Sequence, residues 1–174
     1  VHADSEDGFQ LAGLLCTPRD RGQALVIWVH GLHLGFASAE YCAIGRDVAQ
    51  RGLAFLSAET RGHDFGVWLR GRGGTRLAGS AWEIFSECLA DIGGWLAAAR
   101  AWGYHDVVLA GHGYGAAKVV FHMAERREPD VRGIVIASSG SLVRDPLDPD
   151  RLAQAEAMLA DGRGQDLMPW GTRP

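Results

Sequence analysis

The turn at residues 111–115, Gly-His-Gly-Tyr-Gly, constrains the fold of this chain more than any other stretch. It follows a segment, residues 105–110, that ends in Val-Val-Leu-Ala, and it precedes an alanine- and valine-rich segment, residues 116–127. The first segment predicts a strand and the second a helix. Glycine at position 113 reaches a positive φ without a Cβ clash, and the flanking glycines let strand and helix approach closely. The pattern therefore predicts a strand–turn–helix unit with a tight, strained turn.

Four further stretches have the composition of strands. Ala24–Val29 is a continuous apolar run, the pattern of a strand buried on both faces of a parallel sheet, and Leu53–Ala58 and Val131–Ala137 are also expected to be buried strands. The four predicted strands are Phe9–Cys16, Ala24–Val29, Leu53–Ala58 and Val131–Ala137. Residues 66–79 hold five glycines and predict a loop.

Helical patterns separate these strands. Ser38 can cap a helix that Gly52 closes, and Ser80-Ala81-Trp82-Glu83 has the spacing of a capping box for a helix that stops near Gly103. A further helix is predicted from about Asp150 to Leu159.

This alternation of strands and helices indicates an α/β fold. We expect a mostly parallel sheet with right-handed crossovers and with helices on both faces. A chain of 174 residues suggests one domain over residues 1–174. Within it, residues 138–174 are the place for a lid or a C-terminal extension.

Composition and charge argue against several classes of function. A net charge of −4 with dispersed signs forms no basic patch, so nucleic-acid binding has no support. The uncharged run Gly22–Ala39 contains histidines and glycines, which fit a strand and a loop better than a membrane span. Cys16, Cys42 and Cys88 form no close pair, and the N-terminus lacks the basic region of a signal peptide. We therefore expect a cytoplasmic protein.

With these residues in hand, the chain resembles the α/β-hydrolase superfamily, particularly its small bacterial hydrolases. The resemblance covers residues 8–140. Its matching pieces each follow a predicted strand: Val29-His30-Gly31, Thr60-Arg61-Gly62-His63 and Ala110-Gly111-His112-Gly113-Tyr114-Gly115. Such families carry Gly-His-Ser-x-Gly where this chain has Gly-His-Gly-Tyr-Gly, so the difference falls on the nucleophile itself.

The resemblance implies a role for several residues. Gly113 occupies the nucleophile position of the turn that is called the nucleophile elbow. The backbone N–H groups near Leu32 and at Tyr114 would form an oxyanion hole, which could outlast the loss of the serine side chain. His33, Leu34 and Tyr114 would contact a substrate. The alternative is a vestigial hole that binds only water.

The resemblance also implies that a catalytic triad is incomplete. In this fold the acid and the histidine follow the nucleophile in chain order. No histidine follows His122. The later aspartates fall in loop or helix context: Asp145, Asp148, Asp150, Asp161 and Asp166. The nucleophile and the base are therefore both missing.

Two other histidines are candidate acid/base groups. His63, next to Asp64, follows a strand at the rim where α/β sites form. His112 precedes the elbow glycine, and its simpler interpretation is a packing residue. Arg61 is expected to bond nearby carbonyl groups.

A metal site has little support in the sequence. His30 and His33 could form a metal pair, but no third ligand has a suitable spacing. The simpler interpretation is that both are loop histidines at the mouth of a pocket. We expect no metal and no cofactor.

Three hypotheses follow. The favoured one is a hydrolase-like protein without a working triad that binds or non-covalently transforms a small carbonyl-containing molecule. The second is a fragment or inactivated form of an esterase- or lipase-like serine hydrolase. The third is a non-catalytic binding or assembly module. If Val131–Ala137 ends the sheet, this apolar strand is an aggregation hazard unless covered, and we expect a homodimer through that edge.

Overall fold

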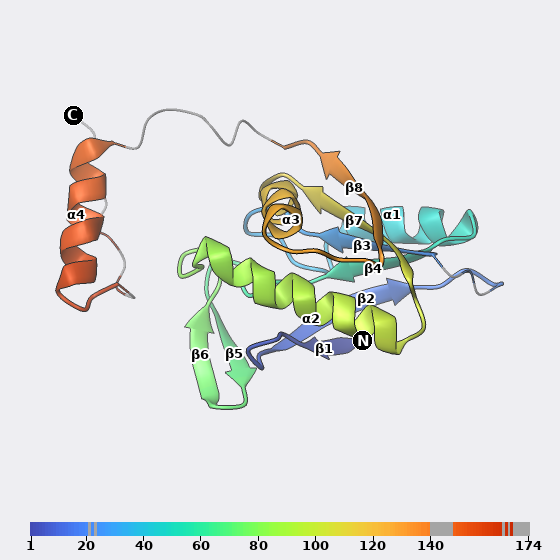
Figure 1. Ribbon diagram of the computed structural model, residues 1–174, viewed down its shortest axis with the longest axis horizontal. Helices are drawn as coiled ribbons and strands as arrows, with labels where there is room; N and C mark the ends of the chain where they lie inside the picture. The colour runs from blue at the N-terminus through green and yellow to red at the C-terminus, as the bar shows by residue number, and fades with distance from the viewer. Residues whose placement is uncertain (21, 23, 140–147, 165, 167, 169–174) are drawn as a thin grey trace. The chain divides into compact units, whose positions relative to one another are not determined.

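The computed structural model describes residues 1–20, 22, 24–139, 148–164, 166 and 168 (Figure 1). The chain divides into two compact units, Val1–Gly140 and Ser141–Pro174. The first unit carries the sheet and every candidate site residue named above. The segment predicted to form a lid or an extension, residues 138–174, lies partly outside the described residues.

The first unit is built on a six-stranded sheet within the described residues, in the order β1-β2-β4-β3-β7-β8. Strands β4, β3, β7 and β8 run parallel, whereas β1 and β2 pair antiparallel at one edge. The strands in chain order are β1 (His2–Asp4), β2 (Gln10–Cys16), β3 (Ala24–Val29), β4 (Ala54–Ala58), β7 (Asp106–His112) and β8 (Val131–Ala137). The sheet is thus mostly parallel, as predicted.

Helices cover both faces of this sheet (Figure 1). They are α1 (Ala39–Gln50), α2 (Cys88–Ala101) and α3 (Tyr114–Glu125), with the short 3-10 helix η1 (Phe85–Glu87) before α2. Successive residues of β3 belong to different cores, because side chains alternate along a strand. Ile27 packs in a core with Trp95 of α2, and Trp28 packs in another with Tyr41 of α1. Two helical layers therefore enclose the sheet.

The glycine-rich stretch at residues 66–79 is a β-hairpin, and the prediction of a loop was wrong. Strand β5 (Val67–Gly71) pairs antiparallel with β6 (Gly74–Ala78). The connection closes at Gly74, whose φ is +120°. A glycine with positive φ is what a tight hairpin turn requires, so the glycines here mark a turn between strands.

The predicted capping box at Ser80–Glu83 was also wrong. Helix α2 begins at Cys88 without a side-chain cap. The Ser80 hydroxyl instead donates to the Asp64 carbonyl, and Glu83 forms an ion pair with Lys118. Both side chains therefore join this loop to distant parts of the chain.

Strand β8 lies at the edge of the sheet within the described residues. Its position matches the prediction, but its expected burial does not. Ile134, Val135 and Ile136 are 44%, 46% and 42% exposed. The prediction took an apolar run to mean two covered faces. Successive side chains point to opposite faces of the sheet, so the described helices leave both faces partly uncovered at this edge strand.

The second unit contains helix α4 (Pro149–Ala160). Its N-cap is Asp148, whose carboxylate accepts a hydrogen bond from the Asp150 N–H at 3.0 Å. The helix spans the stretch predicted from about Asp150 to Leu159. Among the described residues of the chain, no helix is both long and apolar enough to cross a bilayer.

Candidate functional site

The site is centred on the turn between β7 and α3. Gly113 is the N-cap of α3 and adopts φ +55° and ψ −118°. Its N–H donates to the Ala137 carbonyl of β8 at 2.9 Å, which ties the turn to the neighbouring strand. This backbone conformation is strained for any residue with a side chain. The turn therefore has the positive φ that the sequence predicts for this position.

The three glycines of the turn meet different surroundings. A Cβ on Gly111 would collide with the Gly115 carbonyl oxygen, and a Cβ on Gly115 would collide with the Val29 carbonyl oxygen. A Cβ on Gly113 would come no closer than 3.9 Å to the nearest atom, the Gly31 Cα. Close backbone approach thus requires the outer two glycines, whereas space for a side chain exists at Gly113.

The loop after β3 lies next to this turn. The Gly31 N–H donates to the Tyr41 hydroxyl at 3.0 Å, and the Leu34 N–H donates to the Gly31 carbonyl at 3.2 Å. The N–H groups of Leu32 and Tyr114 have no acceptor within the described part of the chain. The Tyr114 N–H belongs to the first turn of α3, where a helix leaves its donors unsatisfied. Gly31 and Gly113 approach each other at the turn. The two candidate donors, Leu32 and Tyr114, are the residues that directly follow them.

His112 is held beneath the turn by Tyr41. The Tyr41 hydroxyl accepts from the Gly31 N–H at 3.0 Å and is hydrogen-bonded to His112 Nδ1 at 2.9 Å. The imidazole also stacks on Trp28, with ring centroids 6.4 Å apart and an interplanar angle of 12°. This geometry is that of a packing and positioning residue.

His30 is buried under the same loop, which corrects its placement at the mouth of a pocket. The Thr60 N–H is an obligate donor and points at Nε2, at 3.1 Å, while Nδ1 donates to the Gly31 carbonyl at 2.9 Å. Burial, followed by the nearby charge of Lys118, lowers the pKa of His30 to about 3. His30 is therefore a neutral structural histidine.

A buried polar chain extends from His30 into α3. The Lys118 Nζ donates to the Thr60 hydroxyl at 3.0 Å, and that hydroxyl lies 3.0 Å from His30 Nε2. Lys118 also pairs with Glu83, and both side chains are almost fully buried. Burial raises the pKa of the neighbouring Cys88 thiol to about 12, so this cysteine is a thiol at neutral pH.

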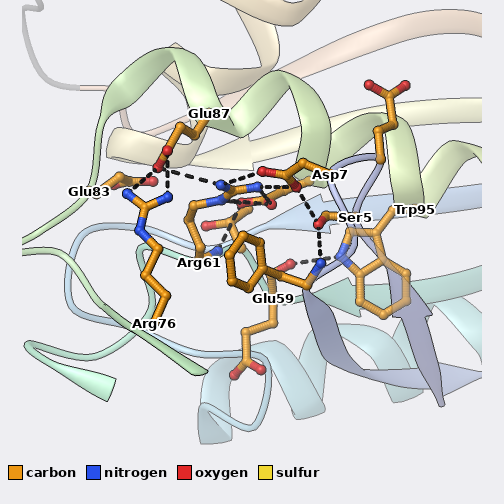
Figure 2. A network of polar contacts seen from close by, with 12 residues as sticks. Ser5, Asp7, Glu59, Arg61, Arg76, Glu83, Glu87 and Trp95 are labelled. Carbon is orange, nitrogen blue, oxygen red and sulfur yellow. Dashed lines mark hydrogen bonds and ion pairs between the residues drawn. The ribbon is translucent and has the colours of Figure 1, made fainter. Parts of the chain in front are cut away.

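Arg61 anchors a second network (Figure 2). Its guanidinium donates to Asp91 at 2.8 Å and to Asp7 at 2.7 Å, and it lies 3.5 Å from Glu87. The expectation that Arg61 bonds carbonyl groups was wrong, because these partners are carboxylates. Asp91 is fully buried, and a buried carboxylate requires a paired cation.

His63 lies between two carboxylates. Its Nδ1 is 2.9 Å from Asp64 Oδ2 and 3.4 Å from Glu59 Oε1. Its Nε2 is buried without a partner among the described residues. Burial raises the pKa of Glu59, and the charge of His63 opposes that shift.

A pocket of about 310 Å³ lies beside this cluster. It is lined by His33, Leu34, Gly35, Phe36, Ala37, Ser38, Glu59 and Asp64. Two of the predicted substrate contacts, His33 and Leu34, therefore lie together. Tyr114 lies apart from them, with its ring 5.4 Å from that of Phe85.

The described residues contain no group of three or more His, Cys, Asp or Glu side chains that could hold a metal ion. His33 instead hydrogen-bonds the Ser80 hydroxyl. The three cysteines are free thiols.

Sequence reasoning missed the polar residues that surround the site. Glu59 and Thr60 directly follow a fully buried strand, and Lys118 interrupts an otherwise apolar helix face. A charged residue among buried neighbours signals a partner. That signal does not identify the partner, because Glu83 lies 35 residues before Lys118 in the sequence.

Comparison with solved structures shows the fold. The chain is similar to DcsB in complex with its substrate analogue, with a TM-score of 0.71, 14% identity, and coverage of 98% of this chain and 55% of that one. It is similar to Est1E from Butyrivibrio proteoclasticus with bound ferulic acid, with a TM-score of 0.60, 20% identity, and coverage of 76% and 50%. It is also similar to the esterase EaEST from Exiguobacterium antarcticum, with a TM-score of 0.62, 16% identity, and coverage of 95% of this chain and 56% of that one.

No protein-family model and no curated protein matches the sequence. The chain spans about half the length of these solved structures. The strand order, the parallel sheet between two helical layers and these similarities together show that the chain has the α/β-hydrolase fold.

Proposed function

We propose that this protein binds a small carbonyl-containing molecule without forming a covalent bond to it. The carbonyl or carboxylate oxygen accepts hydrogen bonds from the N–H groups of Leu32 and Tyr114. The observation that carries the proposal is the room at Gly113, where a Cβ would make an ordinary van der Waals contact, 3.9 Å from the Gly31 Cα. The elbow keeps its strained backbone although no side chain uses it.

The chemistry of the site supports binding of such a molecule, and also reactions in which a negative charge develops on its oxygen. Two backbone donors and the N-terminus of α3 favour a negative oxygen, such as an enolate or a carboxylate. With no nucleophile in the Gly113 position, the reactions that suit such a hole are cyclisation, elimination and isomerisation. Of the two acid/base candidates, His63 has carboxylates at Nδ1 and an Nε2 without a partner among the described residues, whereas Tyr41 occupies Nδ1 of His112.

The second candidate function is an inactivated or partial serine hydrolase. The similarity to esterases such as EaEST favours it, as does the span of about half their length. In this account a serine stands at position 113 in the active form, and the acid and the base lie elsewhere. The third candidate is a non-catalytic binding or assembly module, which would retain the α/β-hydrolase fold without any catalytic activity.

We also propose a homodimer through β8, in a reducing, cytoplasmic setting. The exposed side chains of Ile134 and Val135 lie on the unpaired edge strand of the described sheet. Free thiols at Cys16, Cys42 and Cys88 support the reducing setting.

Calorimetric titration with benzoate and with benzyl alcohol tests the proposal. Benzoate places a carboxylate where the oxyanion would stand, whereas benzyl alcohol has the same ring without the charge. Benzoate should bind about tenfold tighter or better. Equal affinities would contradict a role for the two N–H groups.

Hydrolysis of p-nitrophenyl butyrate separates the first two functions. In the full-length protein, the Gly113→Ser variant should remain without esterase activity if the protein is a non-hydrolytic binder. Hydrolysis above that of a Gly113→Ala control would instead favour an inactivated serine hydrolase.

A further inference from the structure

The pocket beside His63 shares the loop after β3 with the turn at Gly113, but its lining residues do not include Gly113 or Tyr114. Its walls follow two neighbouring parallel strands, with residues 33–38 after β3 and residues 59–64 after β4. The Gly113 turn follows β7, on the other side of β3. The pocket therefore has its own carboxylate wall at Glu59 and Asp64, although His33 in its lining directly follows Leu32.

Glu59 brings a largely buried carboxylate to this pocket. Figure 2 shows its side chain directed away from the Arg61 guanidinium, which is occupied by Asp7 and Asp91. The residue is only 8% exposed, and within the described residues the ionic neighbour of its carboxylate is His63, at 3.4 Å. Its Oε1 lies 3.5 Å from the place of a Cβ on Gly35, at the pocket wall.

The charge of the pocket is negative. His63 Nδ1 is nearer to Asp64, at 2.9 Å, so one imidazole faces two carboxylates. With both carboxyls ionised, the cluster carries net negative charge in either state of the imidazole. The buried cation Lys118 is already paired with Glu83. The pocket thus lacks a neutralising cation among the described residues.

An aromatic and apolar surface adjoins these carboxylates. Leu34 and Phe36 line the pocket itself. The Phe65 ring lies 6.1 Å from the His33 ring and 6.0 Å from the Trp82 ring, and Phe65 is 61% exposed. Aromatic rings next to carboxylates are a combination that recognises organic cations.

We propose that the pocket lined by residues 33–38, Glu59 and Asp64 binds a small organic amine. Its ammonium group donates to the carboxylates of Glu59 and Asp64, and its apolar body packs against Leu34, Phe36 and the Phe65 ring. A volume of about 310 Å³ suits a ligand of one ring and a short chain. The amine provides the cation that a buried carboxylate requires.

Three probes of one shape test this proposal by calorimetry at neutral pH. Tyramine is a cation, 4-ethylphenol is neutral, and 4-hydroxyphenylacetate is an anion. Tyramine should bind about tenfold tighter than 4-ethylphenol or better, and the anion should bind most weakly. Equal binding of the three probes would overturn the proposal.

Charge-removing variants locate the effect. Glu59→Gln should lose about tenfold or more in tyramine affinity, whereas Glu125→Gln, an exposed glutamate of α3, should bind as the wild type does. If Glu59→Gln fails to fold, Asp64→Asn replaces it, because that side chain is 66% exposed. If the variant that folds keeps the tyramine affinity of the wild type, the carboxylates of Glu59 and Asp64 do not bind the amine, and the proposal is contradicted. Benzoate binding at Gly113 is read independently, so either proposal can fail alone.

Discussion

At the scale of single residues, the three glycines of the turn have different roles. Close backbone approach requires Gly111 and Gly115, whereas at Gly113 only the positive φ favours glycine. Gly115→Ala drives a Cβ into the Val29 carbonyl oxygen, whereas the Cβ of Gly113→Ala would make an ordinary van der Waals contact with Gly31. We expect Gly113→Ala to fold at a cost of about 1–3 kcal/mol from backbone strain. Gly115→Ala should cost more or prevent folding. Urea denaturation measures both, and equal losses would contradict this account.

Gly113→Ala should also keep benzoate affinity within about threefold of the wild type, because the proposed site uses no side chain at that position. The comparison is made by calorimetry on variant protein whose circular dichroism spectrum matches the wild type. A large loss of affinity in folded protein would argue against binding at the backbone donors.

His30 predicts a specific dependence of stability on pH. Its pKa is about 3 in the folded chain against an ordinary value of 6.5. Between these values the unfolded chain binds the proton and the folded chain does not, so this group lowers stability as pH falls. The loss approaches about 1.4 kcal/mol for each pH unit and is absent above pH 6.5.

The variant His30→Gln isolates this effect, because an amide can accept from Thr60 and donate to Gly31 without titrating. Denaturant unfolding from pH 7 to pH 4 should show the wild type losing its advantage over His30→Gln as pH falls. A stability difference that stays constant over this range would show that His30 does not titrate as described.

The sequence predicts the conformation of the turn but not the partners of its side chains. The positive φ at Gly113 follows from the glycine spacing, since that conformation disfavours a Cβ. The partners of Arg61 do not follow, because Asp7 and Asp91 are distant in sequence. Local pattern encodes backbone conformation, whereas ion pairing depends on the assembled sheet.

At the scale of elements, the Lys118–Glu83 pair joins α3 to the segment that precedes η1. Lys118→Met leaves the Glu83 carboxylate buried and unpaired, and we expect a loss of about 3–5 kcal/mol. Adding Glu83→Leu removes that charge and should recover much of the loss. The four proteins form a double-mutant cycle in urea denaturation. Strictly additive losses would contradict direct pairing.

The elements themselves show where sequence patterns succeed and fail. The strand at Ala24–Val29 matches its prediction because every residue is apolar and the run is bounded by polar turns. The hairpin at β5 and β6 was missed because glycines in its turn and at its ends resemble a loop. The capping box at Ser80–Glu83 failed because the tertiary partners Asp64 and Lys118 compete for its side chains.

At the scale of the whole molecule, β8 predicts self-association. Val135→Lys places a charge on the edge strand, where Val135 is 46% exposed, and should shift a dimer to monomer in sedimentation velocity. Ile44→Lys on α1, where Ile44 is 37% exposed, serves as the matched control and should leave the dimer intact. A wild-type monomer at high micromolar concentration would contradict the dimer.

The central claim is that Leu32 and Tyr114 donate to the oxygen of a bound carbonyl compound. The most direct measurement follows their backbone amide signals by ¹H–¹⁵N correlation spectroscopy during titration with benzoate. The account predicts that both amide protons move downfield with one common saturation curve, and that benzyl alcohol leaves them in place. If benzoate binds while both signals stay unchanged, or shifts only residues distant from Gly113, the claim is contradicted.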